Sequence, residues 1–246
     1  MLIVAGMGVH DVKDIPLKTI EAAEKADLIY AEFYTSLLTS SLKDLERVIG
    51  RNIELLERSD LEENSGWLIE KAREKDVLIL VPGDPMIATT HSALILEAKK
   101  AGVNVRIIHA SSIASAVCIT GLQFYRFGRT ATVSYRISRY PVDVVEQNWK
   151  INAHTLLLLD LHPEPMRVPK AIDCLFKAGM ENWFAVALAD AGGKNYMKCD
   201  KLDRLSDFNF PGLHSLVVIA KTLHVVEYEY LREFASAPKE LESIVD

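Results

Sequence analysis

The chain carries Val77-Leu78-Ile79-Leu80-Val81-Pro82-Gly83-Asp84-Pro85, an apolar run that ends abruptly at turn-forming residues. A run of this length, partly β-branched and bounded by breakers, predicts a buried strand of a parallel sheet. A helix pattern follows at once, over residues 88–102. Ligands of open α/β sheets bind at the carboxyl edge of the strands, so the turn after this strand is a candidate ligand site. The alternative is an ordinary turn without a ligand, since Pro, Gly and Asp are common loop residues.

The residues of this turn have separate predicted roles. Gly83 lets the backbone approach a ligand closely, because it has no Cβ. Asp84 either pairs with a cationic group or caps the helix that follows. Pro85 suits the first turn of that helix, where its missing N–H costs nothing.

The composition limits the class of protein. Of the 246 residues, 49% are hydrophobic and 25% charged, which is the balance of a soluble globular protein with well-filled cores. No apolar run approaches the ~20 residues that a membrane helix needs. Residues 1–6 lack a basic region and indicate a first core strand, not a signal peptide. The net charge of −6 argues against a nucleic-acid substrate, which usually requires a basic face.

The cysteines and histidines indicate neither a metal centre nor a disulfide framework. Cys118, Cys174 and Cys199 are far apart and lack zinc-ligand spacing, so we expect buried, unreactive thiols in a reduced cytoplasmic protein. The seven histidines are scattered, with no HExxH motif and no pair four residues apart, which predicts no metal site.

Strand-like and helix-like segments alternate along the chain, and this alternation predicts a mostly parallel sheet covered by helices. Ser41, with Asp44 three residues later, is a capping signature that predicts a helix start, and Gly50 predicts its end. Ser65 is expected to cap another helix. Strands of this first series are expected at 2–5, 28–31, 53–56, 77–81 and 103–108, and further helices at 16–26 and 88–102.

A second series begins after about residue 120. Its strands are expected at 130–135, 155–161, 184–188 and 216–219, and its helices at 142–150, 169–178 and 225–235. The segment 109–128 is rich in Ser, Ala and Gly and shows no strong strand, so we place the domain boundary there. The predicted fold is α/β, with an N-terminal domain over 1–115 that carries the Gly-Asp-Pro turn and a C-terminal domain over 116–246.

Three other features invite a functional interpretation. Gly6-Met7-Gly8 follows the first strand, but Asp11 stands where a dinucleotide fingerprint needs its third glycine, so we expect another kind of ligand. His224 lies just past an apolar strand, where the alternatives are a ligand contact and a plain loop histidine. Residues 33–36 (Phe-Tyr-Thr-Ser) are either core plus loop or part of a substrate cleft.

Several short strings along the chain match one known family. They are LIVAGMG at 2–8, AEFYTS at 31–36, PGDPMIATTH at 82–91, HASSI at 109–113, ITGL at 119–122, HTLLLLD at 154–160 and LHVVEYEYL at 223–231. Together they resemble the diphthine synthase family and cover nearly the whole chain. A Gly-Asp-Pro turn alone would indicate only the wider tetrapyrrole-methylase fold, whereas the 31–36 and 83–91 strings together are specific to the diphthine branch.

The resemblance implies an S-adenosylmethionine-dependent methyltransferase that releases S-adenosylhomocysteine. Its implied substrate is translation elongation factor 2, on which the family methylates the amino group of a 3-amino-3-carboxypropyl-histidine. In archaea three methyl groups are added, giving diphthine in diphthamide biosynthesis. The resemblance further implies a cytoplasmic homodimer of two α/β domains of the tetrapyrrole-methylase type, with the cofactor in the cleft between the domains and no nucleic-acid or membrane partner.

The same resemblance places the cofactor contacts but identifies no catalytic base. The sequence departs from the family at 134–142, which is shorter than usual, and at Asp190, where the family usually has Arg; 162–183 is also compact. Val9 and Ile87 replace the family's usual Leu and Val, which are conservative changes. The implied cofactor-binding residues are Val9, Asp84, Ile87, Ser112, Ile113, Leu159, Ala191 and His224.

Three other functions stay open at this stage. A tetrapyrrole (precorrin-type) methyltransferase would share the fold and the cofactor, but the 31–36 string argues against it. An rRNA ribose methyltransferase of the same fold is disfavoured by the acidic balance of the chain. A non-catalytic module that binds S-adenosylmethionine is kept open by the altered 134–142 segment.

Overall fold

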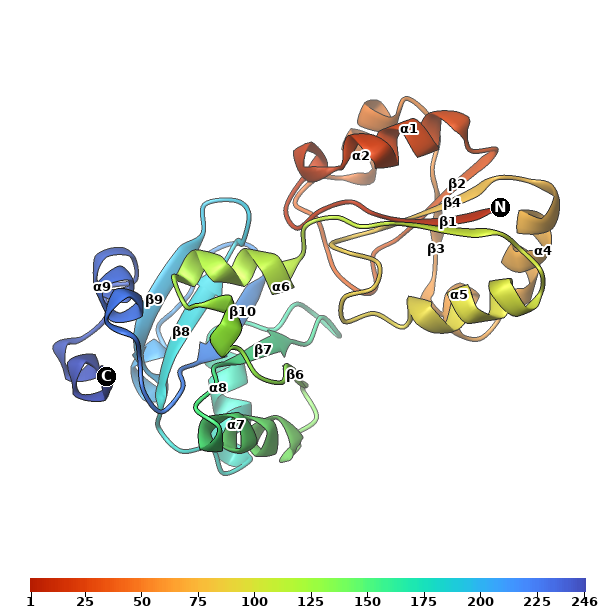
Figure 1. The fold of residues 1–246 in the computed structure, drawn as a ribbon. Coiled ribbons are helices and arrows are strands. Elements are labelled where there is room, and N and C mark those ends of the chain that lie inside the picture. The colour runs from red at the N-terminus through yellow and green to blue at the C-terminus, as the bar shows by residue number, and fades with distance from the viewer. The chain divides into compact units, whose positions relative to one another are not determined.

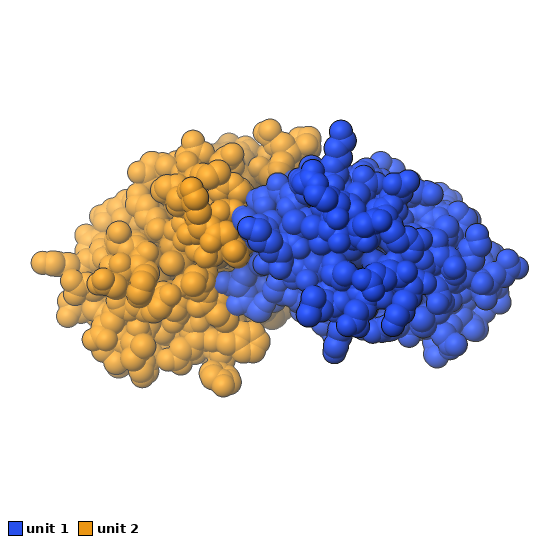
Figure 2. All heavy atoms as spheres, turned by 90° about the horizontal axis from the view of Figure 1, so that it is seen from above, with its two compact units in different colours: residues 1–116 blue, residues 117–246 orange.

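The computed structural model describes residues 1–246. The chain forms two compact units, Met1–Ala116 and Val117–Asp246 (Figure 2). Each unit contains one five-stranded sheet.

The sheet of the first unit is entirely parallel, in the order β3-β2-β4-β1-β5. Its strands are β1 (Leu2–Gly6), β2 (Leu28–Glu32), β3 (Glu54–Leu56), β4 (Val77–Val81) and β5 (Val105–Ile108). Its helices are α1 (Leu17–Lys25), α2 (Leu42–Ile49), α3 (Arg58–Glu62), α4 (Gly66–Glu74), α5 (His91–Lys100) and α6 (Ile113–Ala116), with a short 3-10 helix at Val12–Asp14.

Helices cover both faces of this sheet (Figure 1). Alternate residues of β1 and β4 pack against α1 and α2 on one face and against α4 and α5 on the other. All five residues of each strand are therefore buried, and the apolar run at Val77–Val81 is explained by its central position in the sheet. The predicted parallel sheet is confirmed for this unit.

Local sequence signals explain part of these helix boundaries. Ser41 and Asp44 form the predicted capping box, and Gly50 ends α2 in the left-handed conformation (φ +74°). Ser65 precedes α4 as expected but does not cap it, because its hydroxyl bonds instead to the Glu97 carboxylate at 2.6 Å. The helix α3 was not anticipated from the sequence.

The second unit departs from the parallel expectation. Its sheet has the order β6-β7-β10-β8-β9, in which only β6 and β7 are parallel and the other neighbours are antiparallel. A short loop joins β8 to β9. The sequence pattern did not predict β9, because this strand is only partly buried and carries charged side chains. The strands are β6 (Ala131–Val133), β7 (Thr155–Leu159), β8 (Phe184–Ala189), β9 (Tyr196–Lys201) and β10 (His214–Val218); the helices are α7 (Tyr140–Lys150), α8 (Val168–Lys177) and α9 (Val225–Phe234), and 3-10 helices lie at Val117–Thr120, Phe124–Arg126, Leu202–Leu205 and Lys239–Ile244.

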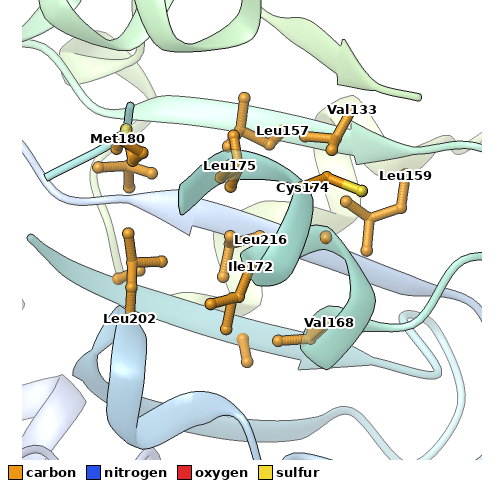
Figure 3. Packing of buried hydrophobic residues seen from close by; sticks show 14 of the residues in the cluster. Val133, Leu157, Leu159, Val168, Ile172, Cys174, Leu175, Met180, Leu202 and Leu216 are labelled. Atoms are coloured by element: carbon orange, nitrogen blue, oxygen red, sulfur yellow. The ribbon is translucent and has the colours of Figure 1, made fainter. Parts of the chain in front are cut away.

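The core of the second unit lies between its sheet and the helices α7 and α8. Ile172 and Leu175 of α8 extend toward Leu157 of β7 and Leu216 of β10 (Figure 3). Cys174 and Cys199 are buried, as predicted. Cys118 is exposed, so the prediction of a buried thiol is wrong there; it lies on a 3-10 helix whose buried positions are Val117 and Thr120.

Candidate functional site

The loops after β1 and β4 meet at the carboxyl edge of the first sheet. The strands β1 and β4 are neighbours in the sheet. After β1 the chain continues to α1 on one face of the sheet, whereas after β4 it continues to α5 on the other face. Such a reversal is the topological switch point at which open α/β sheets bind ligands. Gly8 and Gly83 pair there, with Gly83 N–H donating to the Gly8 carbonyl at 2.7 Å and Gly8 N–H to the Gly83 carbonyl at 3.3 Å.

Glycine is required at this crossing. Gly8 and Gly83 have φ values of +88° and +71°, a region that L side chains rarely adopt. At Gly6, an added Cβ would lie 2.5 Å from the Gly83 carbonyl oxygen and 2.6 Å from the Ala110 Cβ. At Gly83 it would meet only the Ser112 Cβ, at 3.7 Å, which is ordinary van der Waals contact without a clash. The expected close approach of backbone to a ligand is possible at Gly83.

Asp84 shapes the turn and caps no helix. Its Oδ1 accepts from Met86 N–H at 2.9 Å, and its Oδ2 accepts from Ala110 N–H at 3.1 Å and from His109 Nδ1 at 2.8 Å. The carboxylate is only 6% exposed, so both oxygens are used within the protein. His109 is thus a partner of Asp84 within the protein, and the pairing of Asp84 with a cationic group of a ligand stays a prediction.

The helix after the turn begins later than expected. Ala88 has φ +55°, which is incompatible with a right-handed helix, and α5 starts at His91. The predictions that Asp84 caps this helix and that Pro85 lies in its first turn are therefore wrong. The extra residues form a projecting turn in which Met86 and Ile87 are 37% and 43% exposed.

Five of the expected cofactor residues lie along this edge of the first unit. Val9 follows Gly8 and is half-buried, Asp84 and Ile87 belong to the turn after β4, and Ser112 and Ile113 follow β5 at the start of α6. Ser112 is 6% exposed and lies beside Gly83, where an added Cβ would be 3.7 Å from the Ser112 Cβ. The structure brings these residues to adjacent loops of one parallel sheet.

The remaining three lie at two different edges of the second sheet. Leu159 ends β7, and Ala191 lies two residues after the end of β8, at the same edge. His224 follows β10, which runs antiparallel to β7 and β8, with Val218 paired to Thr155 at the start of β7. His224 therefore lies at the opposite edge, and the expectation that this strand ends at a common ligand edge is wrong for β10.

Ala191 is held in a tight turn between β8 and β9. Asp190 has φ +57°, and its carboxylate accepts from Lys194 N–H at 2.8 Å. Gly192 N–H donates to the Asn195 side-chain oxygen at 2.9 Å. The departure from the family at Asp190 thus has a local structural use, because its side chain closes the turn.

Comparison with known proteins adds independent information on this arrangement. The family model described as Tetrapyrrole (Corrin/Porphyrin) Methylases matches residues 1–196. A diphthine synthase of Archaeoglobus fulgidus is 55% identical, with all of both chains covered, and one of Methanocaldococcus jannaschii is 40% identical over 94% of this chain and 98% of its own. A solved structure of diphthine synthase covers the whole of both chains at 54% identity, with a TM-score of 0.96.

The chain belongs to the diphthine synthase family. It is an S-adenosylmethionine-dependent methyltransferase of diphthamide biosynthesis, with the tetrapyrrole-methylase fold. The resemblance of the short strings is confirmed at the level of the family. No helix of the structure combines the length and the apolar character needed to cross a membrane.

The structure of this diphthine synthase family member also reveals a buried carboxylate that sequence reasoning missed. Glu227, in the first turn of α9, is fully buried. It accepts hydrogen bonds from Arg126 Nη1 at 2.6 Å, Gln123 N–H at 2.8 Å, His224 N–H at 3.0 Å and His154 Nε2 at 3.2 Å. Burial alone would raise the pKa of Glu227, but the bonds from His154 and the two backbone N–H groups outweigh it and lower that pKa to about 2.

The hydrogen bonds also define the tautomers of two histidines. Ala220 N–H donates to His154 Nδ1 at 3.0 Å, so the ring proton is on Nε2, which faces Glu227. In His224, Nδ1 accepts from Val226 N–H at 3.2 Å, which leaves Nε2–H as a donor on an exposed side chain. His224 and Glu227 together form the capping box of α9. The spacing of a glutamate three residues after the cap was the signal in the sequence that could have identified Glu227.

Proposed function

We propose that this chain binds S-adenosylmethionine through the switch point of its first unit and methylates elongation factor 2. One observation carries the proposal: the loops after β1 and β4, which pair through Gly8 and Gly83, lie at the switch point of a parallel sheet, where the chain continues to opposite faces. The proposed binding residues of this unit are Val9, Asp84, Ile87, Ser112 and Ile113. The family resemblance also implies Leu159, Ala191 and His224 of the second unit.

The residues of the first unit suit a ligand that is partly apolar and partly polar. Gly83 offers backbone without a side chain, and the exposed Met86 and Ile87 offer apolar contact. Ser112, beside Gly83, supplies a hydroxyl. An adenine ring and a methionine chain need this combination of apolar walls and a few polar groups.

Hydrogen bonds hold the first part of the turn after β4. The oxygens of Val81, Gly83, Asp84 and Pro85 all accept hydrogen bonds from within the first unit. Asp84 contributes by fixing the turn through its three hydrogen bonds.

The cofactor supplies an activated methyl group when bound, so the protein has to bind and orient the reactants. The proposed acceptor is the amino group of 3-amino-3-carboxypropyl-histidine on elongation factor 2, trimethylated to diphthine. The amine reacts in its uncharged form, and no side chain is assigned here as its base. We further propose that the enzyme is a cytoplasmic homodimer, as the family resemblance implies.

Mass spectrometry of the modified protein tests this function. Elongation factor 2 carrying the 3-amino-3-carboxypropyl-histidine is incubated with S-adenosylmethionine and the enzyme. We expect the peptide with the modified histidine to gain the mass of three methyl groups. Asp84→Ala should reduce the rate about tenfold or more by releasing the turn, whereas Asp173→Asn, an exposed residue of α8, should not.

Two results would argue against the proposal. Cofactor binding without any mass gain would favour a tetrapyrrole methylase or a non-catalytic module, and a precorrin substrate would separate these two. If Asp84→Ala methylated at the wild-type rate, the turn after β4 would not be part of the site.

A further inference from the structure

The strings at 31–36 and 83–91 meet inside the first unit through Glu32 and His91, which are not among the proposed cofactor contacts. Glu32 ends β2, and His91 begins α5. Their side chains are 0% and 1% exposed. Two ionisable groups buried in this way need an explanation, because charged groups are costly to bury.

Glu32 holds the loop that follows β2. Its Oε2 accepts from the backbone N–H groups of Tyr34 at 2.9 Å and Thr35 at 3.0 Å, and the Thr35 hydroxyl donates to its Oε1. Oε2 therefore acts only as an acceptor. Oε1 faces His91, with 3.7 Å between Oε1 and His91 Nε2.

His91 holds the turn that follows β4. Its Nδ1 lies 3.2 Å from the Pro85 carbonyl oxygen, which can only accept, so Nδ1 carries a proton. Its buried Nε2 has no hydrogen-bond partner. If Glu32 were ionised and His91 neutral, a lone pair of Nε2 would face a carboxylate oxygen 3.7 Å away, and the two would repel each other.

One additional proton between the two groups removes this conflict. If this proton is on Glu32 Oε1, Oε1 is a hydroxyl that points toward His91 Nε2. Glu32 Oε2 is then the carbonyl oxygen that accepts from two backbone N–H groups. Both groups are then neutral. Burial favours this arrangement, since it raises the pKa of Glu32 and lowers the pKa of His91.

We propose that Glu32 is a neutral carboxylic acid paired with neutral His91, and that these two positioning residues fix the Pro85–Thr90 turn for cofactor binding. The second half of the proposal rests on the proposed function. The pair joins the loop after β2 to the turn after β4, because Glu32 binds Thr35 while His91 binds the Pro85 carbonyl.

The charged and titratable groups around the pair also tie these loops together. The Tyr34 and His91 rings are in edge contact, with 6.3 Å between their centroids. Glu62 of α3 accepts from the Thr90 hydroxyl at 2.8 Å and from Arg58 Nε at 2.7 Å. The Glu62 charge acts on His91 and raises its pKa, but burial outweighs this effect, so the pKa of His91 is lowered.

Nitrogen NMR of the protein labelled with ¹⁵N-histidine tests the charge state and the tautomer of His91 directly. The His91 signals are assigned by their loss in His91→Phe. At neutral pH we expect His91 to be uncharged, with a protonated Nδ1 and a bare Nε2. A charged imidazolium or the opposite tautomer would overturn the neutral pair, and this test does not depend on enzymatic activity.

Titration calorimetry with S-adenosylmethionine tests the positioning role. Glu32→Gln keeps a neutral donor and acceptor, so we expect its Kd to stay within about threefold of the wild type. Glu32→Leu loses both functions and should bind about tenfold or more weakly. If Glu32→Leu does not fold, His91→Phe takes its place, and its Kd should also be about tenfold or more above that of the wild type. Ser65→Ala is the control, because it removes another buried hydrogen bond of this unit.

The outcomes separate this inference from the proposed function. Equally weak binding by Glu32→Gln and Glu32→Leu, or wild-type binding by Glu32→Leu and His91→Phe, would overturn the positioning role. A wild type that binds the cofactor normally but methylates no elongation factor 2 would overturn the proposed substrate and leave the pair intact.

Discussion

The stability of the second unit should depend on pH through Glu227. The pKa of this buried carboxyl falls from its usual value of 4.5 to about 2 in the folded protein. A group whose pKa is lower in the folded state stabilises the fold above its unfolded pKa, and this contribution is lost as the pH falls toward the folded pKa. The shift corresponds to about 3 kcal/mol at neutral pH, of which about 2 kcal/mol is lost between pH 5 and pH 3.

Urea unfolding followed by tryptophan fluorescence measures this effect. Trp67 lies in the first unit, whereas Trp149 and Trp183 stack in the second, with 5.3 Å between their ring centroids. In a Trp67→Phe background the fluorescence therefore reports on the second unit. Glu227→Gln is then compared with the unaltered background at pH 5 and pH 3.

The comparison isolates one carboxyl, because all other groups titrate in both proteins. We expect the stability difference between the two proteins to shrink by about 2 kcal/mol from pH 5 to pH 3. Glu229→Gln, an exposed neighbour on the same helix, should behave like the background. A stability difference that is the same at both pH values would refute the assignment of the low pKa to Glu227.

Three further substitutions have expected outcomes. Gly6→Ala places a Cβ 2.5 Å from the Gly83 carbonyl oxygen, so cofactor affinity measured by calorimetry should fall about tenfold or more; unchanged affinity would exclude the switch point as the binding site. Leu157→Ala empties a fully buried position in the core of the second unit and should cost about 3 kcal/mol in urea unfolding, whereas a loss below about 1 kcal/mol would contradict the tight packing. Ser41→Ala removes the capping box of α2 and should cost about 1 kcal/mol in thermal unfolding, with no loss expected if the cap contributes nothing.

Local patterns in the sequence predicted the elements that depend on local physics. The apolar run at Val77–Val81 predicted a central strand because parallel strands are buried on both faces. Ser41 and Asp44 predicted a helix start because their hydrogen bonds join residues three apart. The turn after β4 showed the limit of such patterns: its helical periodicity begins at Ala88, yet the positive φ of that residue delays α5 to His91.

The sequence by itself determined every strand except β9, most helices, the glycine-rich turns and, through its strings, the family. Only the tertiary structure decided that β10 runs antiparallel and sends His224 to the edge opposite Leu159. It also decided that Glu227 meets His154, 73 residues away, and that Glu32 meets His91. Contacts of this kind carry no periodic signal along the chain, because they depend on which strands pair and in which direction, and that is settled by the packing of the whole unit.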